Sequence, residues 1–335
     1  MRAVICRAYG PVESLRLEET TTPEPGPGEA RIAVKAAGIS FAHTLMVAGK
    51  HQNKPALPFT PGTEAAGIVE AVGPGVDHLK EGDRVVAAIS HGGWAEQAIL
   101  PAANAFRIPD SLAFPAALQF PGGYATVYAT LSWRAGLKPG EVLLVHGAAG
   151  GHGLIAVEIG KALGAMVIAT AGSAEKLATA KRRGADHAIN YREQDFREIV
   201  LGLTKGRGAD VIFDPVGGDV FDLSLRSIAP EGRIIPYGFA GGRIPQIPAN
   251  IVLVKNLTVV GMYWGYYMGW GKTQAPPETR VKVRALIGEL FALYDQGKLK
   301  PEVTRTFPLE QFAPAMGLIE RRESIGKIAL IPPGG

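Results

Sequence analysis

Cysteine is almost missing from the 335-residue sequence, and its scarcity excludes two kinds of chemistry. Cys6 is the only cysteine, so no intramolecular disulfide can form, and nothing in the sequence points to an oxidising compartment. Zinc sites in proteins rely largely on cysteine and histidine. The other candidate ligands, His43, His51 and Glu64, are scattered through a β-rich region, so we expect no metal site.

The sequence also lacks a long apolar run and a block of like charge. No window approaches the roughly 20 apolar residues of a membrane-spanning helix, and the N-terminal stretch has no signal-peptide core. Lys and Arg number 35 against 31 Asp and Glu, and the adjacent arginines at 182–183 and 321–322 fall on expected helix faces. We therefore expect a cytoplasmic protein that binds neither membranes nor nucleic acid.

Glycine, in contrast, is abundant at 43 residues, which suits a chain with many tight turns. In the first third, the alternating segment 30–36 and the apolar runs 66–72 and 84–89 are bounded by turn residues, chiefly glycine and proline. Many short strands between turn signals predict a barrel-like β module.

The middle of the chain alternates between two patterns. Short apolar runs typical of buried strands occupy 142–145, 166–170, 188–189, 211–213, 233–237 and 257–260, and helical patterns occupy 154–163 and 176–183. This alternation predicts an α/β fold with a doubly wound parallel sheet of the Rossmann type. A helix at 279–296 and a strand at 327–331 are expected to return to the first module. The predicted domains are therefore 1–124 with 265–335, the catalytic domain, and 125–264, the nucleotide-binding domain.

The sharpest motif runs from Gly147 to Gly153 and reads GAAGGHG. It lies between a predicted strand and a predicted helix. Glycines in that place allow a tight turn and let the backbone approach a diphosphate, to which the helix N-terminus offers free N–H groups. The alternative is an ordinary strand-to-helix turn, but the strand–turn–helix context favours a dinucleotide site.

The second strand of this module bears on the choice of cofactor. In NAD-binding folds an acid about 20 residues beyond the glycine turn usually binds the ribose 2′-hydroxyl. Here the strand ends at Ser173 without an acid, Lys176 follows, and Tyr191 and Arg192 close the next strand. Hydroxyls and cations suit a 2′-phosphate, and Glu175 is expected to face solvent from a helix start. The sequence therefore predicts NADPH.

With these motifs in place, the chain resembles the zinc-independent quinone oxidoreductases of the medium-chain dehydrogenase/reductase superfamily over nearly its whole length. Besides the glycine turn, the resemblance rests on 57–64 (LPFTPGTE), 69–73 (VEAVG), 82–85 (GDRV), 184–191 (GADHAINY), 214–218 (DPVGG) and 247–265. It implies a barrel-like, GroES-like catalytic domain formed by both chain ends, with a Rossmann domain inserted between them. It also implies a homodimer paired through edge strands, for which the apolar segment 257–262 is suitable.

The resemblance also assigns cofactor contacts by position. The diphosphate would lie at the glycine turn, the 2′-phosphate at the end of the second strand, and the nicotinamide beside three further segments. The assigned residues are Thr126, Gly150, Gly151, His152, Gly153, Ser173, Lys176, Tyr191, Gly238, Phe239, Met262 and Tyr263.

Several positions depart from the family pattern. Relatives usually carry Asn and Asp where this chain has Ser40 and His43, and often a Tyr where it has Leu45. His152 stands where a small apolar residue is usual. In the related zinc alcohol dehydrogenases, ligands of the catalytic zinc fall at the positions of Ser40 and Thr63, which supports a metal-free site. The polar groups around the substrate are therefore altered.

Without a metal, hydrogen bonds must stabilise the negative charge that hydride transfer places on a substrate oxygen. The candidate catalytic donors are Ser40, His43 and Tyr263, none of them expected to be an essential acid, because a quinol or enolate can take its proton from water. An interior, hydrogen-bonded histidine is an equal alternative for His43. The predicted activity is NADPH-dependent reduction of a small quinone or α,β-unsaturated carbonyl. Alternatives are reduction of acrylates or acyl thioesters, and a non-catalytic NADPH-binding structural or RNA-associated protein.

Overall fold

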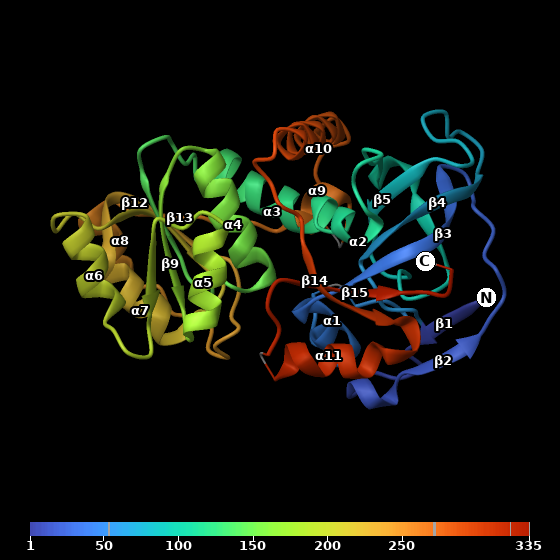
Figure 1. Cartoon of the computed structure of the whole chain (residues 1–335), viewed down its shortest axis with the longest axis horizontal. Coiled ribbons are helices and arrows are strands. Elements are labelled where there is room, and N and C mark those ends of the chain that lie inside the picture. The colour runs from blue at the N-terminus through green and yellow to red at the C-terminus, as the bar shows by residue number, and fades with distance from the viewer. Residues whose placement is uncertain (53, 271–272, 322, 335) are drawn as a thin grey trace. The chain divides into compact units, whose positions relative to one another are not determined.

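The computed structural model describes residues 1–52, 54–270, 273–321 and 323–334, and Arg322 of the second arginine pair lies outside them. The chain divides into two compact units (Figure 1). Unit 1 comprises Met1–Ala125, Trp264–Leu293 and Pro301–Gly335, and unit 2 comprises Thr126–Tyr263 and Tyr294–Lys300. The predicted domain boundaries stay a prediction; they differ from this division chiefly at 294–300, which groups with unit 2.

Within the described residues, unit 2 contains a six-stranded sheet in the order β10-β9-β8-β11-β12-β13. Each pairing in it is parallel. The strands are β8 (Val142–Val145), β9 (Met166–Ala171), β10 (His187–Asn190), β11 (Ala209–Asp214), β12 (Ile228–Pro236) and β13 (Thr258–Val259). The strand order reverses between β8 and β11, and in doubly wound sheets a ligand binds at the carboxyl ends of the strands beside such a reversal. The predicted doubly wound parallel sheet is confirmed.

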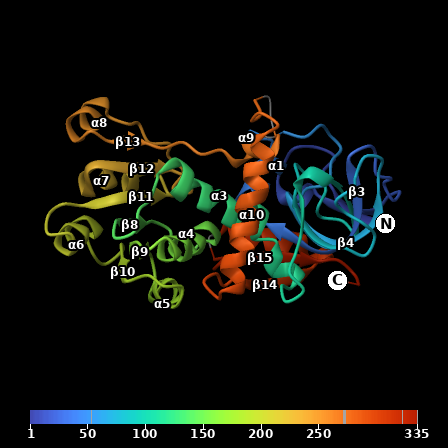
Figure 2. The same ribbon diagram turned by 90° about the horizontal axis from the view of Figure 1, so that it is seen from above.

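Helices cover both faces of this sheet. They are α3 (Ala125–Tyr128), the π-helical η4 (Ala129–Arg134), α4 (Gly151–Ala162), α5 (Ala174–Arg182), α6 (Phe196–Leu203), α7 (Gly218–Ser227) and α8 (Ala249–Lys255). Figure 2 shows α4 and α5 on one face and α6 and α7 on the other. Strand residues Leu144 and Ile212 pack with Phe196 and Phe221 in the core of the second face. Gly164 follows α4 with φ +83°, a conformation that glycine adopts without strain and that commonly ends a helix.

Unit 1 is mainly antiparallel β structure. Its described residues form a seven-stranded sheet, ordered β14-β15-β3-β4-β5-β7 with β6 paired to β3, and a separate β1–β2 pair. The strands are β1 (Arg2–Ile5), β2 (Arg16–Glu19), β3 (Glu29–Ile39), β4 (Glu64–Val72), β5 (Arg84–Ala88), β6 (Gln97–Pro101), β7 (Ala105–Arg107), β14 (Val303–Pro308) and β15 (Lys327–Ile331). Ala30, Ile32 and Val34 of β3 are buried at alternate positions, which is the pattern that predicted this strand.

Unit 1 also contains helical segments. They are η1 (Val12–Ser14), α1 (Phe41–Val47), η2 (Ala102–Asn104), α2 (Phe114–Ala117), the π-helical η3 (Phe120–Tyr124), α9 (Trp264–Met268), α10 (Thr279–Asp295), η5 (Leu309–Gln311) and α11 (Phe312–Glu320). The 17-residue α10 reaches into the part of the chain that groups with unit 2. β15 pairs antiparallel with β3, so the C-terminal strand returns to the first module as predicted. Among the described residues, no helix combines the length and apolarity needed to cross a membrane.

Residues 294–300 are anchored to unit 2 by a buried ion pair. The side chains of Arg183 and Glu158 are 8% and 3% exposed. Arg183 also donates to the carbonyl of Lys300, whose backbone N–H lies 3.4 Å from a Glu158 carboxylate oxygen. Removing one partner of a buried ion pair is strongly destabilising, because the other charge is left buried and unpaired. The Arg183–Glu158 pair therefore holds residues 294–300 in place.

Candidate functional site

The glycine turn forms a backbone-lined cradle at the start of α4. Gly147 has φ +56°, and a Cβ on Gly153 would lie 2.2 Å from the Gly147 carbonyl oxygen, so the turn excludes a side chain there. Gly150 is the N-cap of this 12-residue helix, and no side chain caps it. The first N–H groups of the helix therefore keep their capacity for an external anion, and the cradle fits a diphosphate.

A buried histidine fixes the strand that leads into this turn. Nε2 of His146 lies 2.8 Å from Ser224 Oγ, and Nδ1 lies 2.9 Å from Thr170 Oγ1. Because Ser224 Oγ donates to the Val220 carbonyl, it accepts from Nε2–H, and Thr170 donates to Nδ1. Burial lowers the pKa of His146 to about 3. The neutral ring thus links β8 to β9 and α7 below the cradle.

Hydroxyl and cationic groups gather where β9 and β10 end. Ser173 is the N-cap of α5, and its Oγ accepts a hydrogen bond from the backbone N–H of Lys176. A Cβ built on Gly172 would lie 2.8 Å from Tyr191 Oη and 3.0 Å from Arg192 Nε, so both groups lie over the end of β9. Glu175 is exposed, as predicted. This arrangement suits a phosphate ester.

Asp214, at the end of β11, organises two loops of this edge. Its Oδ1 accepts from the N–H groups of Val216 and Gly217, and its carbonyl accepts from those of Tyr237 and Gly238. Its Oδ2 is buried and has no hydrogen-bond partner among the described residues. Burial raises the pKa of this carboxyl group. An orphaned buried oxygen is expected to meet a water or a ligand hydroxyl.

His152 forms a contact that the sequence did not predict. The residue is exposed on the first turn of α4, and its Nδ1 lies 3.1 Å from Tyr237 Oη, with the two rings edge to face at 5.4 Å. Tyr237 follows β12 and packs against Phe213, with ring centroids 4.4 Å apart. Gly238 and the 40% exposed Phe239 come directly after it.

Unit 1 holds a second group of candidate residues, here called the polar cluster: Ser40, His43, Thr63, Glu64 and Lys327. His43 is fully buried. Backbone N–H groups approach both of its ring nitrogens, from Ser40 at 3.0 Å to Nδ1 and from Thr63 at 3.1 Å to Nε2. Because these groups only donate, a doubly protonated ring would face two donors. Desolvation, followed by the charge of Lys327, lowers the pKa of His43 to about 3.

The neutral His43 ring has one proton to share with a hydroxyl group. Ser40 Oγ lies 3.3 Å from Nδ1 and Thr63 Oγ1 lies 3.1 Å from Nε2, and the ring also packs against Trp94 at 5.1 Å. The structure therefore brings the two candidate donors Ser40 and His43 together. Their geometry is that of an interior histidine that orients two hydroxyl groups.

Beside His43, Glu64 and Lys327 form an ion pair with side chains 10% and 11% exposed. Two glycines make room for it: a Cβ on Gly38 would lie 2.2 Å from Glu64 Oε2, and one on Gly122 would lie 2.1 Å from Oε1. No local sequence pattern indicates this pair, because its members are 263 residues apart. It joins the starts of β4 and β15.

The remaining predicted residues lie in unit 2. Thr126, in α3, accepts a hydrogen bond from Thr130 Oγ1 at its carbonyl. Met262 and Tyr263 follow the edge strand β13, and Tyr263 is 39% exposed, with a pKa raised by desolvation. Tyr263 thus belongs to a different unit from Ser40 and His43, the other two catalytic candidates.

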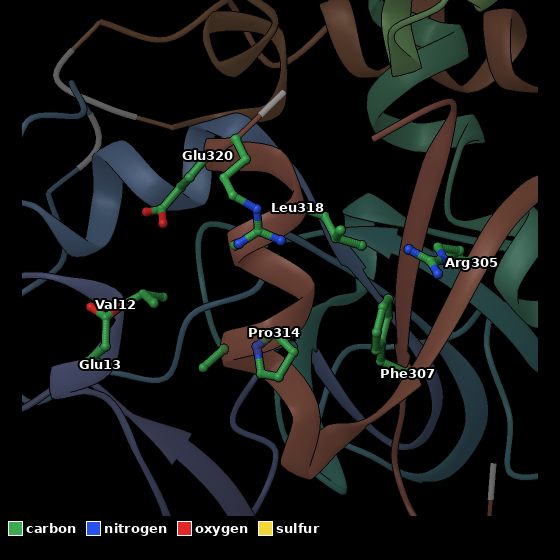
Figure 3. A pocket seen from close by; sticks show the side chains of 10 residues that line it. Val12, Glu13, Arg305, Phe307, Pro314, Leu318 and Glu320 are labelled. Carbon is green, nitrogen blue, oxygen red and sulfur yellow. The ribbon is translucent and has the colours of Figure 1, made fainter. Parts of the chain in front are cut away.

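A hollow of about 500 Å³ lies elsewhere, within unit 1. Figure 3 shows Val12 of η1, Arg305 and Phe307 of β14, and Leu318 and Glu320 of α11 around it. None of the predicted cofactor or catalytic residues lines it, and its rim carries exposed charges of both signs. We therefore do not assign the substrate to this hollow.

Two family models match the chain. Residues 26–110 match the alcohol dehydrogenase GroES-like domain, and residues 151–275 match the zinc-binding dehydrogenase family. Among curated proteins, the quinone oxidoreductase-like protein 2 homolog of Nematostella vectensis is 41% identical over 333 residues, which cover 98% of this chain and 88% of the relative.

Solved structures agree over the whole chain. A quinone oxidoreductase of Pseudomonas syringae pv. Tomato DC3000 is 34% identical, with a TM-score of 0.89 and 99% of each chain covered. The quinone oxidoreductase of Escherichia coli complexed with NADPH is 32% identical, with a TM-score of 0.88, and covers 99% of this chain and 100% of its own. The chain belongs to the quinone oxidoreductase family of the medium-chain dehydrogenase/reductase superfamily.

Proposed function

We propose that the protein is an NADPH-dependent oxidoreductase that reduces a quinone or an α,β-unsaturated carbonyl without a metal. One observation carries the proposal. At the carboxyl edge of the unit 2 sheet, a glycine cradle after β8 neighbours a group of hydroxyls and cations after β9. The Escherichia coli relative complexed with NADPH supports the same choice of cofactor.

Bound at this edge, NADPH would supply the hydride from C4 of its nicotinamide. The backbone N–H groups of Gly151, His152 and Gly153 would bind the diphosphate, and Ser173 and Lys176, with Tyr191, would bind the 2′-phosphate. Asp214 holds the loop that presents Gly238 and Phe239. By family position, these two residues, Thr126, Met262 and Tyr263 would flank the nicotinamide.

The polar cluster would act on the substrate through its hydroxyl groups. Ser40 is half-buried, and its hydroxyl is the group of the cluster that we propose donates to the developing oxyanion. His43 is a positioning residue in this scheme, because its ring is fully buried and hydrogen-bonded to Ser40 and Thr63. The proton of the reduced product would come from water.

The geometry of His43 also supports metal-free chemistry. A histidine binds a metal through a nitrogen lone pair, and both nitrogens of His43 are approached by backbone N–H groups. The neighbouring hydroxyl groups of Ser40 and Thr63 are poor zinc ligands compared with cysteine and histidine. The buried carboxylate of Glu64 is paired with Lys327.

A steady-state screen of NADPH oxidation against quinones, enones, acrylates and acyl thioesters tests this function. We expect the highest kcat/KM for a quinone or an enone. If only acrylates or acyl thioesters were reduced, the proposed quinone or enone substrate would be wrong. Tight NADPH binding with no oxidation by any acceptor would favour the alternative, a non-catalytic NADPH-binding protein.

We also propose a homodimer that pairs through β13. This two-residue strand lies at the edge of the six-stranded sheet described above, and α8, directly before it, carries the exposed side chains Leu253 and Val254. An unpaired edge beside apolar side chains favours association. Light scattering at micromolar concentration should give twice the chain mass, and a monomer mass would exclude the dimer.

A further inference from the structure

The side chains of His152 and Tyr237 connect two segments that follow different strands of the unit 2 sheet. His152 stands at the start of α4, after β8, and Tyr237 stands after β12. In the sheet, β11 lies between those two strands. The side chains therefore bridge the end of β11, where ligands of doubly wound sheets cross the sheet edge.

Tyr237 is held firmly enough to position its partner. Its backbone N–H donates to the Asp214 carbonyl at 2.8 Å, and its ring packs against the fully buried Phe213. His152, in contrast, is an exposed side chain on the first turn of a helix. Exposed side chains sample several rotamers, and a hydrogen bond to a fixed phenol group selects one of them.

We propose that Tyr237 positions His152 as a side-chain ligand for the cofactor diphosphate, an inference that rests on the proposed function. With the phenol donating to Nδ1, the ring proton of neutral His152 resides on Nε2, which becomes a donor toward an anion at the cradle. The helix N-terminus supplies backbone donors to the same anion. The pair thus adds a side-chain donor to a site that glycines otherwise form from backbone alone.

This arrangement predicts a specific pattern of ligand dependence. The diphosphate is common to NADPH and NADH, so loss of the pair weakens both by the same factor. Adenosine 2′-phosphate lacks the diphosphate and reports only on the adenosine end of the site. Tyr237→Phe keeps the ring that packs against Phe213 and removes only the hydroxyl.

Calorimetric binding of NADPH, NADH and adenosine 2′-phosphate to the full-length protein tests the proposal. Wild type, Tyr237→Phe, His152→Val and the double variant are compared. We expect each single substitution to raise the Kd of NADPH and NADH equally, by roughly three- to tenfold. The double variant should bind no more weakly than His152→Val, and adenosine 2′-phosphate should bind all four proteins alike.

Tyr191→Phe provides the matched control. It also removes a phenol hydroxyl group, but from the residue directly after β10, where the 2′-phosphate is proposed to bind. It should weaken NADPH and adenosine 2′-phosphate and spare NADH. An unchanged NADPH affinity in Tyr237→Phe, multiplicative effects in the double variant, or weaker adenosine 2′-phosphate binding would overturn the positioning role alone. A wild type that binds no NADPH would overturn the proposed function as well.

Discussion

In unit 1, the polar side chains of the cluster are buried or half-buried and paired with one another, whereas in unit 2 the predicted phosphate-binding residues lie at turns and helix starts beside the carboxyl ends of the strands. His43 is fully buried between two backbone donors, while His152 is exposed and contacts the phenol group of Tyr237. Such a difference separates two tasks. In the proposed function, the unit 2 edge binds the phosphates of the cofactor, and the unit 1 cluster keeps its hydroxyl groups in place.

Two buried histidines sharpen the contrast. Desolvation lowers the pKa of both His43 and His146 to about 3. His146 lies between two hydroxyl groups, whose hydrogen bonds place its ring proton on Nε2. For His43, the charge of Lys327 lowers the pKa in addition to desolvation. Neither ring can serve as a proton donor near neutral pH, and both act through the groups they hold.

The largest effect should come from filling the unit 2 cradle. Gly153→Ala places a Cβ 2.2 Å from the Gly147 carbonyl and 2.9 Å from Ala148 Cα. We expect a loss of about 3 kcal/mol in the free energy of unfolding and, because the turn must shift, NADPH binding weakened by on the order of 100-fold. Denaturant unfolding and calorimetry measure the two effects.

Gly202→Ala in α6 is the control, because a Cβ there meets nothing within 4 Å and alanine favours a helix by roughly 1 kcal/mol. It should leave NADPH binding unchanged. If wild type and Gly153→Ala bound NADPH equally well, the glycine turn would not be part of the cofactor site.

Lys176→Ala should come next and should separate the two nicotinamide cofactors. A hydrogen bond to a charged group contributes about 1.5–3 kcal/mol, so the Michaelis constant for NADPH should rise roughly 10- to 100-fold, while that for NADH stays nearly the same. The maximal rate should change little, because the lost binding is uniform. Lys181→Ala, at an exposed position of the same helix, is the control. Equal weakening of both cofactors would show that Lys176 supports the fold instead.

The buried histidines predict a loss of stability in acid. Their folded pKa of about 3 lies below the unfolded value of about 6.5, so their contribution is complete above pH 6.5 and declines as the pH falls toward 3. From pH 7.5 to pH 5.0, each should account for about 2 kcal/mol of lost stability.

Denaturant unfolding of wild type, His43→Gln and His146→Gln at both pH values checks this prediction. Each variant should be less stable than wild type at pH 7.5 and should lose about 2 kcal/mol less on acidification. An acid-induced loss as large in a variant as in wild type would mean that its histidine is not buried in the neutral form.

Chelation should have the smallest effect, namely none. The polar cluster offers hydroxyl groups, a paired carboxylate and a histidine whose two ring nitrogens are each approached by a backbone N–H group. Dialysis against a strong zinc chelator should leave the rate of NADPH oxidation and the metal content, near zero per chain, unchanged. About one zinc per chain, with activity lost on its removal, would contradict the metal-free site.

The sequence predicted those features whose signal is local. The glycine turn, the strands of the parallel sheet and the missing acid after β9 can each be recognised within a few residues, because backbone geometry dictates them. Short helices such as α1 and α11 carry a weaker signal. α11 is apolar on most sides and has Pro314 in its first turn, where proline is tolerated.

Side-chain pairs between distant segments could not be predicted in the same way. Glu64 and Lys327 are 263 residues apart, and His152 and Tyr237 are 85 residues apart. Only the fold brings them together. Tyr237 did carry a weak signal, because it ends a predicted strand directly before Gly238, where side chains of a doubly wound sheet reach the ligand.

The kcat/KM of wild type for NADPH and for NADH, measured with one quinone at fixed ionic strength, is the sharpest test of the unit 2 edge as an NADPH site. Ser173, Lys176 and Tyr191 stand where an acid would select NADH. We expect a preference for NADPH of about 2–4 kcal/mol, or roughly 30- to 1000-fold. Equal use of the two cofactors would contradict the assignment of the 2′-phosphate to this edge.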